Sequence, residues 1–107
     1  MQRVASVIKA QPAKYALYKK IHAAVWPDVL KTIKKCHIRN YSIFYRDGLL
    51  FSYYEYTGKD HAADMKKMAA DPATRKWWAI CRPCLQPFKT VPKGQWSAMM
   101  TEIFRLD

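Results

Sequence analysis

Hydrophobic and polar positions along the chain follow two different periods, and the changes between them divide the sequence into predicted elements. A period of two residues is typical of a strand with one buried face, and a period of 3.6 residues is typical of an amphipathic helix. The two-residue period predicts strands over residues 3–10, 39–46, 49–56 and 97–106. The helical period predicts helices over residues 13–25, 27–37, 59–70 and 73–82.

Turn and capping residues separate these elements in the order β-α-β-β-α-β. Asp47-Gly48 joins two predicted strands, and glycine tolerates the positive φ that a tight hairpin turn requires. Pro27 divides the first helical region, because proline lacks the N–H of a helix interior. Asp71 precedes Pro72 and is expected to cap the last helix. This order predicts an α+β, ferredoxin-like fold, in which a four-stranded antiparallel sheet carries the helices on one face.

The face of this sheet without helices is expected to be covered, either by a second copy of the chain packed sheet against sheet or as a covered pocket. The predicted strand 49–56 carries apolar and aromatic side chains on both faces, which indicates a central strand covered on both sides. Large apolar patches are rare on the surfaces of monomers. We therefore expect a homodimer in which the sheets of the two chains pack against each other in a barrel-type association. Each chain is expected to form a single domain that spans residues 1–107.

Composition and charge narrow the possible surroundings and partners. No apolar run approaches the roughly 18 residues that a membrane span needs, so no membrane partner is expected. Three cysteines leave one unpaired in any disulfide scheme, which favours a reducing compartment and a cytoplasmic location. The net charge is +11, but the cations are scattered over predicted helix faces. That scatter indicates solvated surfaces, so no specific nucleic-acid partner is expected.

The spacing of Cys81 and Cys84 raises the possibility of a redox or metal site. A redox pair needs its first cysteine at a helix N-terminus, whereas this pair lies at the C-terminal end of a predicted helix, where the dipole opposes a thiolate. A zinc site needs a second pair, and Cys36-His37 is the only candidate. We interpret these cysteines as incidental, and we expect neither a metal nor a cofactor.

Tyr18, His22 and Trp26 recur at intervals of four residues immediately before Pro27. On a helix they share one face, so a packing stripe is the simplest interpretation. A site is the alternative, since an imidazole near phenols can transfer protons close to neutral pH. That face offers His22 no carboxylate and no second histidine, which argues against a metal site or a triad. Free carbonyls at the helix end are expected to favour the imidazolium form of His22.

Two adjacent indoles, Trp77 and Trp78, point about 100° apart if they lie on a helix. They therefore cannot enter one core in the same way. One can pack while the other faces a cavity, where a flat indole suits the apolar face of a sugar. The alternative of one core tryptophan and one at an interface stays open.

Four motifs, taken in order, resemble the L-rhamnose mutarotase family over almost the whole chain. They are Tyr18 with His22-x-x-x-Trp26-Pro27, Asn40-Tyr41-Ser42-Ile43-Phe44, Trp77-Trp78, and Met99-x-x-Glu102-Ile103-Phe104. The resemblance implies a dimeric ferredoxin-like isomerase that interconverts the α and β anomers of L-rhamnose or a related 6-deoxy hexose without a cofactor. It implies His22 as the general acid/base. It also implies that the sugar is held by Tyr18, Tyr41, Trp77 and Trp78.

Two other functional classes remain open. A dimeric ferredoxin-like monooxygenase or haem-binding protein shares the expected fold, but a fold alone does not assign a function. A small-ligand or RNA-binding module is the non-enzymatic alternative. The strand 48–56 is aromatic like that of an RNA-recognition motif, but Asp47 stands where such a motif has Lys or Arg.

Overall fold

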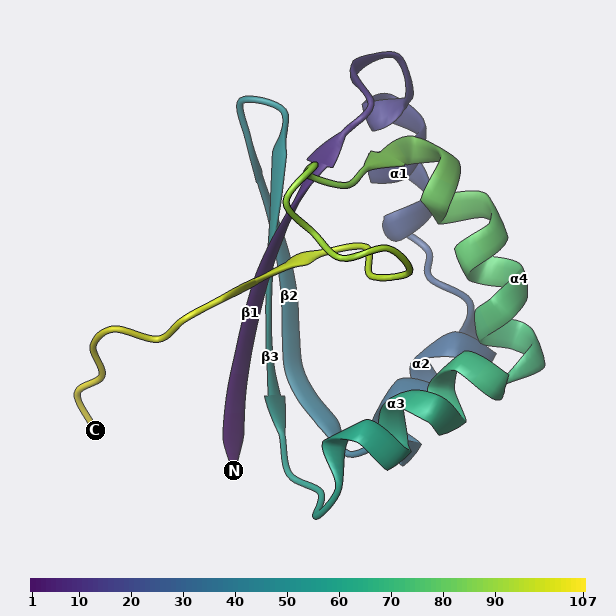
Figure 1. The fold of residues 1–107 in the computed structure, drawn as a ribbon. Coiled ribbons are helices and arrows are strands. Elements are labelled where there is room, and N and C mark those ends of the chain that lie inside the picture. Colours follow the sequence, from purple (N-terminus) through teal and green to yellow (C-terminus); the bar gives the residue numbers. More distant parts are fainter.

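The computed structural model describes residues 1–107 as an antiparallel sheet with all the helices on one face (Figure 1). Its strands are β1 (Gln2–Ala10), β2 (Ile38–Arg46), β3 (Leu49–Tyr56), β4 (Leu85–Gln86) and β5 (Ala98–Met100). Its helices are α1 (Tyr15–His22), α2 (Pro27–Lys35), α3 (His61–Ala70) and α4 (Pro72–Cys81). Short 3₁₀ turns, η1 (Pro12–Lys14) and η2 (Arg82–Cys84), precede α1 and follow α4. The predicted α+β class is confirmed.

The sheet is built around β3, which pairs with β2 on one side and β1 on the other. The β2–β3 hairpin turns at Asp47-Gly48, where φ is +51° and +80°, so the hairpin prediction is confirmed. The other edge of β1 pairs with β4 near Lys9 and with β5 over Ala5–Val7. Two short segments therefore occupy the place of the expected fourth strand.

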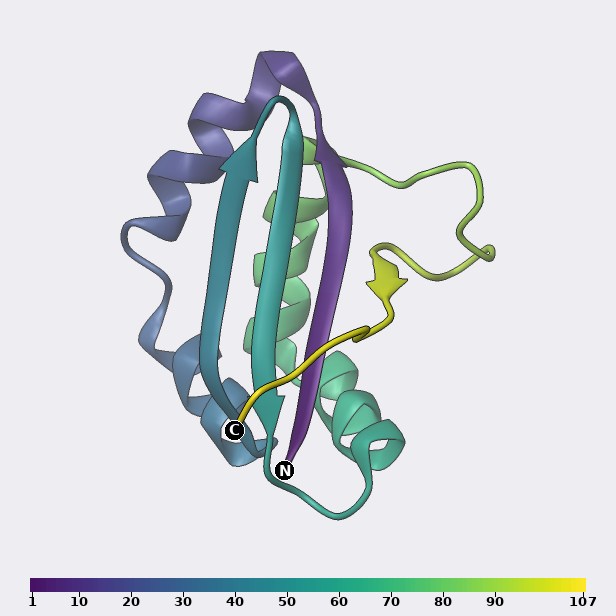
Figure 2. The ribbon, with the colours of Figure 1, turned by 90° about the vertical axis from the view of Figure 1, so that its left-hand side faces the viewer.

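The predicted last strand, 97–106, is wrong over most of its length, because only Ala98–Met100 pairs with β1. Residues 101–107 leave the sheet and cross in front of β1 and β3 (Figure 2). A two-residue period records a preference for extended backbone, but a strand also needs a neighbouring edge. The tail finds none within this chain, and Ile103, Phe104 and Leu106 are 94%, 81% and 85% exposed.

The first helical region ends earlier than predicted. α1 stops at His22 instead of continuing to residue 25, and Trp26 is extended, with φ −59° and ψ 135°. After His22 the chain tightens, because Ala23 and Ala24 donate to the carbonyls of Lys20 and Ile21 three residues earlier, and Pro27 disfavours a helical conformation at Trp26. Trp26 therefore does not continue the α1 face that carries Tyr18 and His22. The cap predicted at Asp71 is confirmed, since its carboxylate accepts a hydrogen bond from the Thr74 N–H at 2.9 Å.

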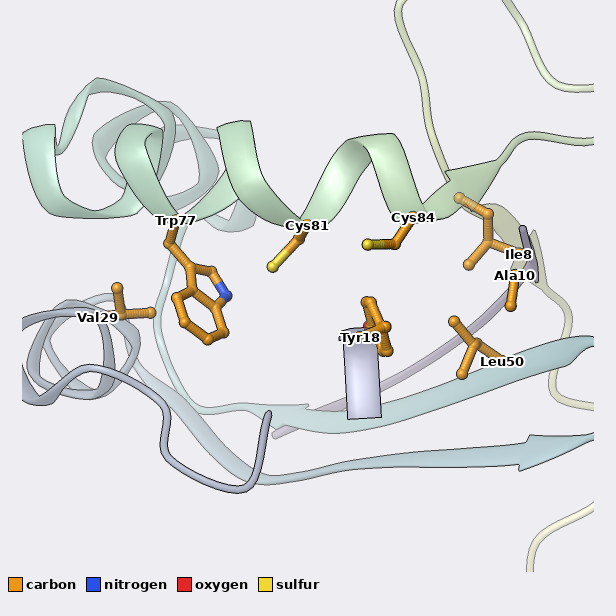
Figure 3. Packing of buried hydrophobic residues seen from close by; sticks show 8 residues of the cluster. All are labelled: Ile8, Ala10, Tyr18, Val29, Leu50, Trp77, Cys81 and Cys84. Carbon is orange, nitrogen blue, oxygen red and sulfur yellow. The ribbon is translucent and has the colours of Figure 1, made fainter. Parts of the chain in front are cut away.

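The main core fills the space between the sheet and the helices. Figure 3 shows side chains of α4 and η2 directed toward the sheet, with Tyr18 of α1 between them. The cluster consists of Ile8, Ala10, Tyr18, Val29, Leu50, Trp77, Cys81 and Cys84. Both of its cysteines are free thiols and pack there as small apolar side chains. No helix combines the length and the apolar character needed to cross a bilayer.

A polar cluster, separate from the main core, connects α3 to the ends of β2 and β3. Asp64 is buried, and its Oδ2 accepts a hydrogen bond from the Tyr56 hydroxyl and lies 3.0 Å from His37 Nδ1. Beside it, the Tyr54 hydroxyl lies 2.6 Å from His61 Nε2. Two of the chain's three histidines therefore contribute to this cluster, whereas His22 lies apart from it.

Candidate functional site

A cavity of about 230 Å³ lies between the helix-facing side of the sheet and helices α1 and α4. That volume is below the roughly 300–1,000 Å³ of drug-sized pockets, so it suits a small ligand. Its lining includes all five side chains selected from the sequence, namely Tyr18, His22, Tyr41, Trp77 and Trp78. The structure thus brings together residues that are up to 60 positions apart, as counted from residue 18 to residue 78.

His22 is held between two aromatic rings at the end of α1. Its imidazole stacks on Tyr18 with ring centres 4.0 Å apart, and it meets the edge of Trp77 at 5.3 Å. Its Nδ1 lies 2.7 Å from the backbone oxygen of Tyr18. A carbonyl oxygen only accepts hydrogen bonds, so Nδ1 carries a proton. In the neutral ring, Nε2 then has a free lone pair.

Burial lowers the pKa of His22 below its ordinary value of 6.5, and the hydrogen bond to Tyr18 opposes the shift only in part. The predicted imidazolium is therefore wrong. The helix-end carbonyl does stabilise an N–H, but removing the ring from water has the larger effect. His22 is consequently neutral at pH 7 and can accept a proton.

The other titratable side chains of the cavity keep their protons far above neutral pH. Burial, with a smaller contribution from Tyr41, raises the pKa of Tyr18 well above its ordinary range. Burial also raises the pKa of Tyr41 to about 12, although 46% of that residue is exposed, because protein surrounds its hydroxyl. The pKa of Cys81 is likewise raised by burial, to about 12. These groups can donate hydrogen bonds, and only His22 can exchange protons near pH 7.

The two adjacent tryptophans have different surroundings, as their angular separation requires. Trp77 is 6% exposed and packs edge-on against Trp26 at 5.1 Å as well as against His22. Trp78 is only partly buried and lies beneath the guanidinium of Arg82 at 4.5 Å. Trp77 is therefore both a core residue and a wall of the cavity.

Sequence reasoning missed several lining residues, including Ser52, Arg82, Trp96 and Ser97. Arg82 follows Trp78 by four residues, and that spacing could have indicated a shared helix face. No sequence pattern near Trp96 indicates that it lines the cavity, because its position depends only on the path of the connection between β4 and β5. Ser52 lies in β3, where its hydroxyl meets that of Ser6 at 2.6 Å.

A larger groove, of about 760 Å³, lies where α2 approaches α3 and the start of α4. Its charged lining residues are three lysines and two aspartates, and it contains no histidine and no aromatic ring. It therefore offers no group that exchanges protons near pH 7 and no flat apolar wall. The smaller cavity around His22 is the better candidate site despite its size.

Comparison with known sequences finds one family. A family model described as L-rhamnose mutarotase matches residues 3–106. The L-rhamnose mutarotase of Oceanobacillus iheyensis is 29% identical over 109 residues, which cover 100% of both chains. That of Mannheimia succiniciproducens is 36% identical over 84 residues, 77% of this chain and 78% of the relative. That of Listeria monocytogenes is 35% identical over 88 residues, 80% of this chain and 82% of the relative.

Solved structures show the same fold. The crystal structure of an L-rhamnose mutarotase from Formosa agariphila matches with a TM-score of 0.78 and 23% identity, over 100% of both chains. Tetracenomycin F2 cyclase from Streptomyces glaucescens matches with a TM-score of 0.76 and 13% identity, over 100% of this chain and 98% of the other. At such identities these matches establish the fold alone. They do not support the monooxygenase alternative better than the mutarotase interpretation. The sequence matches, in contrast, cover nearly the whole length of the chain. They show that the chain belongs to the L-rhamnose mutarotase family.

Proposed function

We propose that this chain is an isomerase that interconverts the α and β anomers of L-rhamnose or a related 6-deoxy hexose, with His22 as its general acid/base. The observation that carries the proposal is the hydrogen bond from His22 Nδ1–H to the Tyr18 carbonyl, 2.7 Å long. It leaves Nε2 as an acceptor in a cavity whose other titratable groups stay protonated. The family to which the chain belongs is named for this activity.

Neutral His22 can supply both proton transfers of the reaction in succession. Nε2 first accepts the proton of the anomeric hydroxyl, and the bond between C1 and the ring oxygen breaks to give the aldehyde. The protonated imidazole then gives that proton to the former ring oxygen. After rotation about the C1–C2 bond, the same steps in reverse close the ring on the other face of C1. Atoms and protons balance without a further reactant, and such assistance is typically worth about 10²–10⁴-fold.

The aromatic residues of the cavity would hold the sugar in this scheme. Tyr18 and Tyr41 remain protonated at neutral pH, so their hydroxyls can donate hydrogen bonds to sugar oxygens. Trp77 and Trp78 supply flat apolar surface for the C–H groups of the ring and exclude water from it. Each of these four residues contacts the ligand in our proposal, and only His22 moves a proton.

Saturation-transfer NMR on L-rhamnose tests the proposal directly. The wild-type chain is expected to accelerate exchange between the anomeric signals, and His22→Ala is expected to lose most of that acceleration while keeping its circular dichroism spectrum. Lys20→Ala changes an exposed residue of the same helix and serves as the matched control. An undiminished exchange rate in a folded His22→Ala variant would contradict the assignment.

The same proposal includes a homodimer formed through the helix-free face of the sheet. Val7, Phe51 and Phe44 lie in register across three strands on that face, and Phe44 is 63% exposed. The tail 101–107 also projects from this face (Figure 1), and its Ile103, Phe104 and Leu106 are exposed. A second copy would cover both surfaces. Light scattering is expected to give twice the 12.5 kDa of one chain, and a monomer at micromolar concentration would contradict this part.

We also propose a cytoplasmic location and no specific nucleic-acid partner. Three buried free thiols are compatible with a reducing compartment. On the helix-free face, Arg3 is already paired with Glu102 at 2.7 Å, which leaves that cation less available to phosphate groups. Titration with oligonucleotides is expected to show only weak binding that disappears with salt.

A further inference from the structure

Arg82 places a permanent positive charge in the wall of the cavity. Its guanidinium carbon lies 4.5 Å from the centre of the Trp78 ring and 5.1 Å from that of Trp96. The two indoles belong to different segments, α4 and the connection before β5, so they hold the guanidinium from separate directions. A side chain that is already held loses little freedom when it binds a ligand. Arg82 is therefore preorganised for a ligand.

No acidic group of the chain neutralises this charge. None of the five ion pairs involves Arg82, and the cavity lining contains neither Asp nor Glu. A guanidinium stays protonated at any pH at which proteins fold. A partly buried cation without a counter-ion is unfavourable, so a negatively charged ligand gains by occupying the cavity.

The hydrogen-bonding groups of the cavity favour the same kind of ligand. The lining contains neither Asn nor Gln and no carboxylate, so its side-chain acceptors are hydroxyls and the imidazole. The hydroxyls of a neutral sugar are donors as well as acceptors and therefore need acceptors in the protein. A carboxylate or phosphate oxygen only accepts, and the five N–H groups of arginine only donate. An arginine fork also matches both anions in geometry.

We propose that Arg82, held by Trp78 and Trp96, is an anion subsite, through which the cavity accepts, in addition to the neutral 6-deoxy hexose of the proposed function, an aldose with a carboxylate or phosphate group and binds that aldose more tightly. This inference rests on the proposed function, because it assigns the substrate class of the same cavity. His22 serves the anomeric carbon, and Arg82 binds the anionic group at another position of the same sugar. Arg82 is a specificity-determining residue and takes no part in proton transfer.

Four sugars of one ring configuration test the subsite: L-rhamnose, L-mannose, L-mannuronate and L-mannose 6-phosphate. They differ only at C6, and anomer exchange by NMR gives kcat and KM for each. The KM of at least one anionic sugar is expected to lie about tenfold or more below that of L-rhamnose. The two anions separate a carboxylate-bearing substrate from a phosphate-bearing one. Arg82→Gln is expected to raise the KM of the preferred anion by about 10- to 100-fold, the range for a hydrogen bond to a charged group.

Three variants show whether the charge itself is responsible. Arg82→Gln is expected to raise the KM of the preferred anion at least about tenfold more than it changes the KM of L-rhamnose, and Arg82→Lys is expected to keep part of the preference for the anion. Arg75→Gln removes an equal charge from an exposed position of α4 and is expected to change neither KM. Equal KM values for charged and neutral sugars in the wild type would overturn the subsite. An equal rise for both sugars in Arg82→Gln would also overturn it, because Arg82 would then only support the wall.

Binding measured by tryptophan fluorescence separates this inference from the proposed function. Trp78 and Trp96 lie against Arg82, so ligand binding there is expected to change their emission. If no sugar is isomerised but L-mannuronate or the phosphate binds in an Arg82-dependent way, the subsite stands and the mutarotase proposal fails. If L-rhamnose is isomerised and no anion binds more tightly, the mutarotase proposal stands and the subsite fails.

Discussion

His22 and His37 each use Nδ1 to hold a fixed orientation, but their partners differ in charge. His22 bonds a neutral backbone carbonyl at 2.7 Å and is surrounded by aromatic rings. His37 lies 3.0 Å from the buried carboxylate of Asp64, and half of its side chain is exposed. The Tyr56 hydroxyl and then His37 lower the pKa of that carboxyl below its ordinary value.

The difference separates a group that lies beside a cavity from one that holds a structure together. A partner at Nδ1, whether a carbonyl or a carboxylate, fixes the tautomer of an imidazole and leaves its second nitrogen free. His22 lines the cavity, so its second nitrogen is placed for chemistry. The Asp64 carboxylate bonds the Tyr56 hydroxyl as well as His37, so it makes His37 part of the attachment of α3.

The largest expected effect comes from replacing each histidine by glutamine. His22→Gln is expected to lower kcat for anomer exchange by about 10²–10⁴-fold, because an amide cannot shuttle a proton near neutral pH. His37→Gln is expected to leave kcat unchanged and to lower the midpoint of thermal unfolding. NMR exchange and thermal denaturation of the same two samples measure both properties. A comparable loss of kcat in His37→Gln would abolish the distinction between the two sites.

The pH dependence of exchange provides the next test. Below its lowered pKa, His22 carries protons on both nitrogens and cannot accept another, so the rate is expected to fall about tenfold per pH unit. The midpoint is expected below 6.5, because burial favours the neutral ring. The tyrosines of the cavity should add no alkaline limb near neutral pH. A midpoint above 6.5 would mean that the helix-end carbonyl outweighs burial after all.

The sequence predicts the His22 site better than it predicts the edges of the molecule. Local periodicity gave β1, the β2–β3 hairpin and the helices within a few residues, and the family resemblance gave the five cavity residues. The end of α1 was misjudged, because the chain already tightens at Ala23 and Ala24, before the constraint of Pro27 on Trp26 begins. The tail 101–107 and Trp96 depend on contacts distant in sequence, which no local pattern records. The direction of the His22 pKa shift likewise required knowledge of its burial.

The smallest expected effect concerns Asp64, and it tests the structural half of the comparison. Asp64→Asn keeps the shape of the side chain and an acceptor for Tyr56, but it removes the charge facing His37 and Lys67. Because the folded-state pKa of Asp64 is lowered, its charge contributes stability in full above the unfolded-state value of about 3.9. That contribution is lost as the pH falls through the folded-state pKa.

Wild type is therefore expected to be the more stable protein in urea at pH 7, and its advantage over Asp64→Asn should shrink as the pH falls below about 4. The matched control is Asp47→Asn, which changes an exposed aspartate of the hairpin whose left-handed φ asparagine also tolerates. Its stability should follow that of the wild type at every pH. If Asp64→Asn lowered kcat while unfolding at the same urea concentration as wild type, the carboxylate would act on the chemistry at His22. The two histidine environments would then be parts of one site.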